Sequence, residues 1–129
     1  MTYKKLLVIT LWLVTLHSFV VGIAMILLPT DWISYFDITL SEHRFFITQG
    51  GVFHIVMAIA YGMAAYYVNG SSALIKFSII AKFIATLFLL SYFIFFNQFV
   101  IIFLSAIGDF CMGLLILIVY KKYKEEIAT

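Results

Sequence analysis

ALIKFSIIAKFIATLFLLSYFIFF, residues 73–96, is the stretch that decides the fold of this chain. An α-helix needs roughly 20 mostly apolar residues to cross the hydrocarbon layer of a membrane, and this run is long enough. Three further apolar runs cover approximately residues 5–28, 45–67 and 99–120. Because these runs and their short connections use nearly every residue, we predict an all-α integral membrane protein. The expected architecture is an antiparallel bundle of four transmembrane helices in a single domain, residues 1–129.

The composition excludes a water-soluble globular protein. Hydrophobic residues make up 65% of the chain and charged residues only 11%, whereas a soluble domain has about a quarter charged residues and just under half apolar ones. The first run is too long for the core of a signal peptide and lacks an Ala-x-Ala cleavage site, so we interpret it as a retained helix. Cys111 is the single cysteine, which excludes disulfides within the chain and thiolate metal clusters.

The distribution of basic residues predicts the orientation of the helices. With four crossings, one side carries Lys4, Lys5, Lys76, Lys121, Lys122 and Lys124, and a loop on the other side carries Arg44. Cytoplasmic loops are enriched in lysine and arginine. We therefore predict a multi-pass protein of the cell's inner (plasma) membrane with both termini in the cytoplasm. The aromatic connection 29–44 would then lie in the outer head-group layer.

Ionisable side chains interrupt all four apolar runs: His17, His54, Lys82 and Asp109. Each lies within about two residues of the midpoint of its run, which is roughly 3 Å along a helix axis. An ionisable group at mid-bilayer costs a few kcal/mol, so such groups normally face the interior of a bundle. We therefore expect the four side chains to converge in the core. Lys82 and Asp109 would form an ion pair, with the histidines hydrogen-bonded to them.

Two interpretations of this polar cluster remain open. It can be purely structural and fix the register of the helices, or it can line a ligand or proton site, which is the usual role of intramembrane ionisable groups. Paired glycines one turn before His54 permit close approach by another helix or by a flat ligand. The candidate binding residues are therefore His17, His54, Lys82, Asp109, Gln49, Gly50 and Gly51. No metal-ligand spacing accompanies them, so we expect no metal.

Two segments carry a resemblance to a known family. GIAMILLPTDWISYF, residues 22–36, is followed by Arg44 and then by QGGVFH, residues 49–54, with Tyr61-Gly62 further on. This pattern resembles the DoxX-like group of small four-helix membrane proteins, with the BphX-like members nearest. The resemblance implies a compact antiparallel four-helix bundle that often acts as a membrane subunit linked to quinone or thiol redox chemistry. The chain differs from the group in lacking an acidic residue within its second run, and no catalytic residue is carried over.

The expected function is that of a membrane-embedded binding module or accessory subunit, within a larger membrane complex or a homo-oligomer. Its polar cluster would accept the head of a quinone-like or lipid-like amphiphile, which makes a quinone the candidate cofactor. The alternative is a small proton-coupled transporter that works as an oligomer. The binding or accessory role is favoured, because small multidrug-resistance transporters have an essential glutamate in their first helix, whereas the first run of this chain has His17 and the carboxylate within the apolar runs is Asp109.

Other functions fit the sequence less well. His17 and His54 could be axial haem ligands, but the haem propionates would then lie far from water, so we expect no haem. The chain has no nucleophile elbow, no HExxH motif and no phosphate loop, which favours a role without enzymatic activity. It also lacks a basic domain, so nucleic acid is not an expected partner.

Overall fold

The protein is all-helical over the residues that the computed structural model describes, which are 2–29, 44–70, 72–96 and 98–128. The helices within these ranges are α1 (Tyr3–Leu27), α3 (Phe45–Tyr66), α4 (Ser72–Phe95) and α5 (Val100–Glu126). Each of the four is long and apolar enough to cross a membrane. No strand occurs in the described ranges. The prediction of an all-α chain with four helices that could span a membrane is confirmed for these ranges. The aromatic connection lies outside the described residues between Pro29 and Arg44.

Helix boundaries agree with the apolar runs to within about two residues, except at the end of α5. We predict an end near residue 120, but α5 continues to Glu126. Hydropathy falls at Lys121, yet Tyr123 two residues later is buried and belongs to the hydrophobic core. The helix continues because its tyrosine face still has a packing surface after the apolar run has ended.

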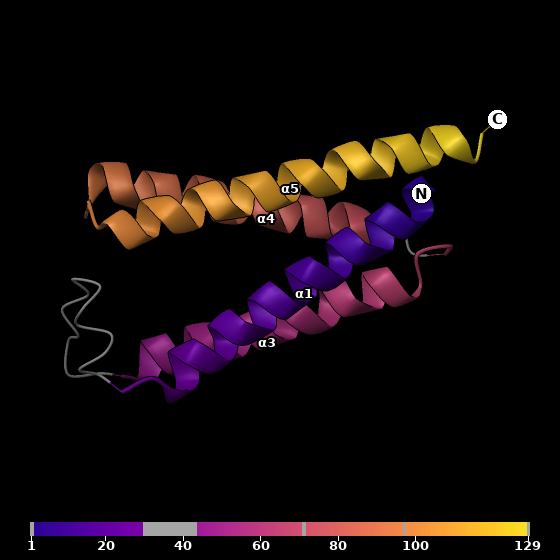
Figure 1. Cartoon of the computed structure of the whole chain (residues 1–129). Coiled ribbons are helices and arrows are strands. Elements are labelled where there is room, and N and C mark those ends of the chain that lie inside the picture. Colours follow the sequence, from indigo (N-terminus) through magenta and orange to yellow (C-terminus); the bar gives the residue numbers. More distant parts are fainter. Residues whose placement is uncertain (1, 30–43, 71, 97, 129) are drawn as a thin grey trace.

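The four helices pack as two pairs, α1 with α3 and α4 with α5 (Figure 1). Fewer contacts join the pairs, and these run from α1 to α5 and from α3 to α4. The two chain ends lie at the same end of the molecule in Figure 1. There the amide of Lys4 donates a hydrogen bond to the Glu126 carboxylate at 3.4 Å, and the hydroxyls of Ser72 and Tyr120 lie 2.6 Å apart. The starts of α1 and α4 therefore lie beside the last turns of α5.

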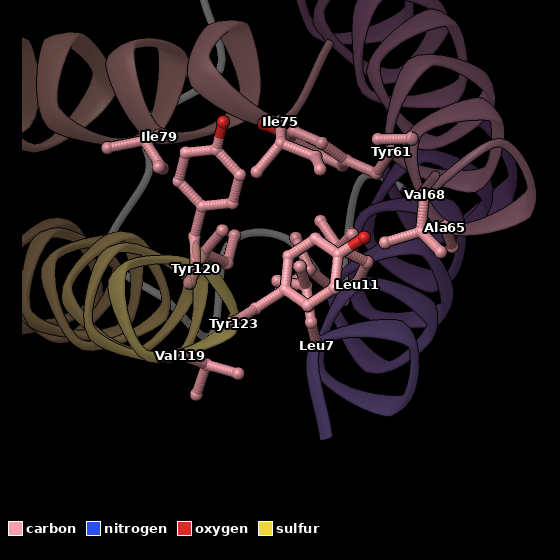
Figure 2. Close-up of a cluster of buried hydrophobic side chains, with 13 residues drawn as sticks. Leu7, Leu11, Tyr61, Ala65, Val68, Ile75, Ile79, Val119, Tyr120 and Tyr123 are labelled. Atoms are coloured by element: carbon pink, nitrogen blue, oxygen red, sulfur yellow. The ribbon is translucent and has the colours of Figure 1, made fainter. Parts of the chain in front are cut away.

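The hydrophobic core lies where the two pairs meet and includes residues from all four helices (Figure 2). Its members include Leu7, Leu11, Tyr61, Ile75, Tyr120 and Tyr123. Much of the remaining apolar surface stays exposed, as at Leu13, Phe53 and Phe95. In water such a surface would promote aggregation, but it matches the hydrocarbon of a bilayer. The core therefore joins the pairs, while the outward faces suit lipid.

Close approach of α1 and α3 depends on two glycines. A Cβ atom placed on Gly22 would lie 2.7 Å from the carbonyl oxygen of Gly51, and a Cβ on Gly51 would lie 2.7 Å from the carbonyl oxygen of Gly22. The two backbones can approach this closely only because neither residue has a side chain. Gly50 faces the same helix, and a Cβ there would lie 2.8 Å from the Met25 Cε atom. The paired glycines therefore serve helix packing, one of the two uses that the sequence allows.

Arg44 connects the end of α1 to the start of α3. Its Nη2 atom donates hydrogen bonds to the carbonyl oxygens of Ile26, at 2.8 Å, and Leu28, at 2.9 Å. The last carbonyls of a helix lack intrahelical donors, and Pro29 has no N–H to offer. The guanidinium group therefore satisfies carbonyls that the end of α1 leaves open.

Candidate ligand-binding site

Lys82 and Asp109 form a buried ion pair between α4 and α5. The Lys82 Nζ atom lies 2.6 Å from the Asp109 Oδ1 atom, and the two residues are 3% and 8% exposed. An ion pair inside a membrane protein satisfies both charges where water cannot. The predicted pairing of these two residues is therefore confirmed.

Small and hydroxyl-bearing neighbours allow the pair to form. Ser78 and Thr86 lie one turn before and after Lys82 and are also buried, so this face of α4 points inward. Their hydroxyls donate to backbone carbonyls of their own helix and need no other partner. On α5, a Cβ on Gly113 would lie only 3.0 Å from the Lys82 Cβ atom. The absence of a side chain at Gly113 therefore lets Lys82 approach α5 and reach Asp109.

Tyr61 on α3 supplies a second contact for the lysine. The Lys82 Nζ atom lies 5.4 Å from the centre of the Tyr61 ring, within the range of a cation–π interaction. Tyr61 itself is buried. The positive charge therefore contacts a carboxylate from its own helix pair and an aromatic ring from the other pair.

A partly open recess of about 210 Å³ lies beside the ion pair, and all four helices contribute to its lining. The lining residues are Ser18 from α1, Phe53, His54, Met57 and Tyr61 from α3, Ala81, Lys82 and Ala85 from α4, and Asp109 from α5. This volume equals that of about seven water molecules at roughly 30 Å³ each. Sites for whole drug-sized ligands start at roughly 300 Å³. The recess therefore fits a head group or a single ring rather than a complete amphiphile.

A larger hollow of about 350 Å³ lies on α1 alone. Its lining residues are Phe19, Val20, Ile23, Ala24, Leu27 and Leu28, all of them apolar. Such a surface can contact a lipid chain, but it offers no side-chain polar group to orient a ligand. We therefore place the candidate site at the recess beside the ion pair.

The two histidines do not form the hydrogen bonds to the ion pair that the sequence predicts. His54 is partly buried and lines the recess, but among the described residues no hydrogen bond joins it to Lys82 or Asp109, which bond to each other. His17 is exposed and does not line the recess, and its neighbour Ser18, 1% exposed, does. Successive residues of a helix are rotated by about 100°, and at this point of α1 it is Ser18 that faces the core. The predicted convergence of four ionisable groups is therefore wrong for His17.

The remaining predicted residues also lie outside the recess. Gln49 is exposed, and Gly50 and Gly51 pack against α1. Conversely, Tyr61 and Ser18 line the recess although neither is among the predicted site residues. Tyr61 follows His54 by seven residues, which is two helical turns, so a search along one face of the helix could have found it. Ser18 precedes Gly22 by four residues, and two small residues at this spacing are typical of the inward face of a membrane helix, so this pattern could have found Ser18.

No family model, curated protein or solved structure matches the chain. Among the described residues, no three histidine, cysteine, aspartate or glutamate side chains gather in a way that could hold a metal ion. The recess itself is lined by an ion pair, an imidazole and the hydroxyl groups of Ser18 and Tyr61.

Proposed function

We propose that this chain is an antiparallel four-helix protein of the inner (plasma) membrane that binds the head group of an amphiphile, quinone-like or lipid-like, beside Lys82 and Asp109. In this proposal it acts as a binding or accessory subunit within a larger membrane complex or a homo-oligomer, with both termini in the cytoplasm. The observation that carries the proposal is the recess, to which every described helix contributes and which borders a buried ion pair. Ligand sites in helical bundles typically lie in such a position.

The space beside the pair supports binding over a purely structural role. Protein interiors are normally close-packed, and a pair that served only to fix helix register would need no adjoining volume. Ala81 and Ala85 leave that volume open on α4. Phe53, which lines the recess, is 61% exposed and lies where an apolar tail could continue into the hydrocarbon. A polar head in the recess and a tail against Phe53 together describe an amphiphile.

Filling the recess tests this proposal. We expect Ala85→Leu to weaken retention of a bound amphiphile about tenfold, equivalent to about 1.4 kcal/mol, because the larger side chain occupies the space of the head group. The ion pair is left intact. Native mass spectra of the full chain extracted in mild detergent measure any retained non-covalent mass, and they report the number of chains in the particle.

Ala73→Leu is the matched control. It makes the same change on the same helix, but Ala73 is exposed and does not line the recess, so the retained mass should not change. Equal retention by wild type and Ala85→Leu would rule out the recess as the binding site. A dimer or larger particle without any bound mass would favour the transporter instead.

The proposed orientation has its own test. The lysines near the chain ends and Arg44 at the start of α3 are the observations that support it. We expect alkaline phosphatase fused to either terminus to be inactive, because this enzyme needs export to fold, and green fluorescent protein at the same positions to fluoresce. Active phosphatase at both termini would reverse the orientation, and activity at one terminus only would exclude an even number of crossings.

A further inference from the structure

The charges of the recess balance. Lys82 and Asp109 are the charged residues among those that line it, and they carry opposite charges on atoms 2.6 Å apart. The other polar lining groups are the His54 imidazole and the hydroxyls of Ser18 and Tyr61. With His54 neutral, a ligand therefore meets a dipole and a set of hydrogen-bonding groups rather than a net charge.

An anionic head group gains little from this arrangement. An anion within hydrogen-bonding distance of the Lys82 amine would lie within roughly 6 Å of the bonded Asp109 oxygen, because two hydrogen-bond lengths separate them at most. Repulsion by the carboxylate then offsets much of the attraction to the amine. The anion would also lose its hydration on entering the bundle, and that penalty is large for an ion.

A neutral oxygen acceptor is better matched. An ammonium group has three N–H donors, and the structure shows one hydrogen bond, to Asp109. A second N–H remains to donate to a carbonyl oxygen without displacing the carboxylate. The imidazole of His54, which forms no hydrogen bond with described residues, can donate to the same head group. A neutral carbonyl also loses far less hydration than an ion on entering the recess.

We infer that the recess selects an electrically neutral head group bearing a carbonyl oxygen and discriminates against anionic head groups. This inference rests on the proposed function and names the class of its ligand. Among the membrane amphiphiles with such a head are those with a ring ketone of the quinone type and those with a neutral glyceride ester. Both place a carbonyl oxygen next to an apolar tail, which suits a recess lined by Lys82 and by the exposed Phe53.

Three probes with comparable tails test the inference on the purified full chain in a non-ionic detergent. Decyl-benzoquinone carries ring carbonyls, monodecanoyl glycerol carries a neutral ester, and decyl phosphate carries an anion. We expect at least one neutral probe to bind about tenfold more tightly than decyl phosphate, measured by titration calorimetry and by competition in native mass spectra. The neutral probe that binds more tightly identifies which kind of amphiphile the recess takes.

Variants of the pair give a second readout. Asp109→Asn leaves Lys82 as an unbalanced cation, so the preference should shift toward decyl phosphate by about tenfold. The double variant Lys82→Gln/Asp109→Asn restores a neutral pair and should retain the preference for the neutral probes. If Asp109→Asn does not fold, the wild-type competition and the double variant still decide the question.

Different results would overturn this inference alone or overturn the proposed function as well. Decyl phosphate binding as tightly as the neutral probes, in a manner sensitive to Ala85→Leu, would overturn the neutral class and keep the recess as a site. Failure of all three probes to bind wild type, or binding that Ala85→Leu leaves unchanged, would overturn both.

Discussion

Removing one partner of the Lys82–Asp109 pair is expected to destabilise the protein by about 3–5 kcal/mol. Lys82→Met leaves the Asp109 carboxylate buried without its partner at 2.6 Å, and Asp109→Leu does the same to the Lys82 ammonium. The penalty arises from the stranded charge more than from the lost attraction, because a charge that stays buried without its partner keeps its desolvation cost uncompensated. The change in the free energy of unfolding can be measured on the purified protein in micelles. Dodecyl sulfate is added stepwise, and circular dichroism follows the loss of helix.

The double variant Lys82→Met/Asp109→Leu distinguishes a stranded charge from a lost contact. Buried ion pairs can often be replaced by apolar side chains of similar volume at little cost, so the double variant should recover most of the stability. The exposed pair of Lys122 and Glu125, 2.9 Å apart with side chains 50% and 66% exposed, is the control. Lys122→Ala should leave the midpoint of dodecyl sulfate unfolding unchanged. If the single variants at the buried pair unfold at the same dodecyl sulfate concentration as the wild-type protein, then both charges reach water in the folded state.

Gly51→Ala is expected to destabilise the protein by about 1–3 kcal/mol, despite alanine's greater helix propensity. Its Cβ atom would lie 2.7 Å from the carbonyl oxygen of Gly22 and equally close to a carbon of Ile26. A backbone oxygen cannot rotate away, so α1 and α3 would have to move apart. The same dodecyl sulfate titration measures this loss of stability. Gly22→Ala should act similarly, and the two effects should not add, because either one separates the helices.

Gly108→Ala provides the matched control for the glycine crossing. Gly108 lies within α5, and a Cβ placed there meets no other atom within 4 Å. Without a clash, only the helix propensity changes, which favours alanine by about 1 kcal/mol. Gly51→Ala should therefore lower the stability of the protein, and Gly108→Ala should raise it. Stabilisation by both would contradict the close approach of α1 and α3.

The existence of the helices and the ion pair could be predicted because both follow from one-dimensional properties. Crossing a bilayer requires a long apolar run, and the described part of the chain has four. Lys82 and Asp109 each lie near the middle of a run, and opposite charges at the same depth have a strong reason to pair. Neither inference needs knowledge of which way a helix is rotated.

The rotation of each helix could not be predicted, and the errors follow from this. On α1, Leu11 is fully buried and Leu13 is exposed, although the two side chains are identical. Lipid and protein core are equally apolar, so hydrophobicity does not mark the inward face. Polarity therefore suggested His17 for the core, whereas Ser18 faces it. Nothing in the sequence pairs Gly51 with Gly22 either, because that contact depends on two rotations at once.

Both members of the ion pair belong to the α4/α5 pair, 27 residues apart along the chain. During biosynthesis these helices can therefore enter the bilayer together as a hairpin whose two charges already neutralise each other, which lowers the insertion cost that each would carry alone. The other hairpin, α1 and α3, supplies Ser18, His54 and Tyr61. The recess is consequently completed only when two inserted hairpins associate, so the second hairpin should insert even in a chain that lacks the first.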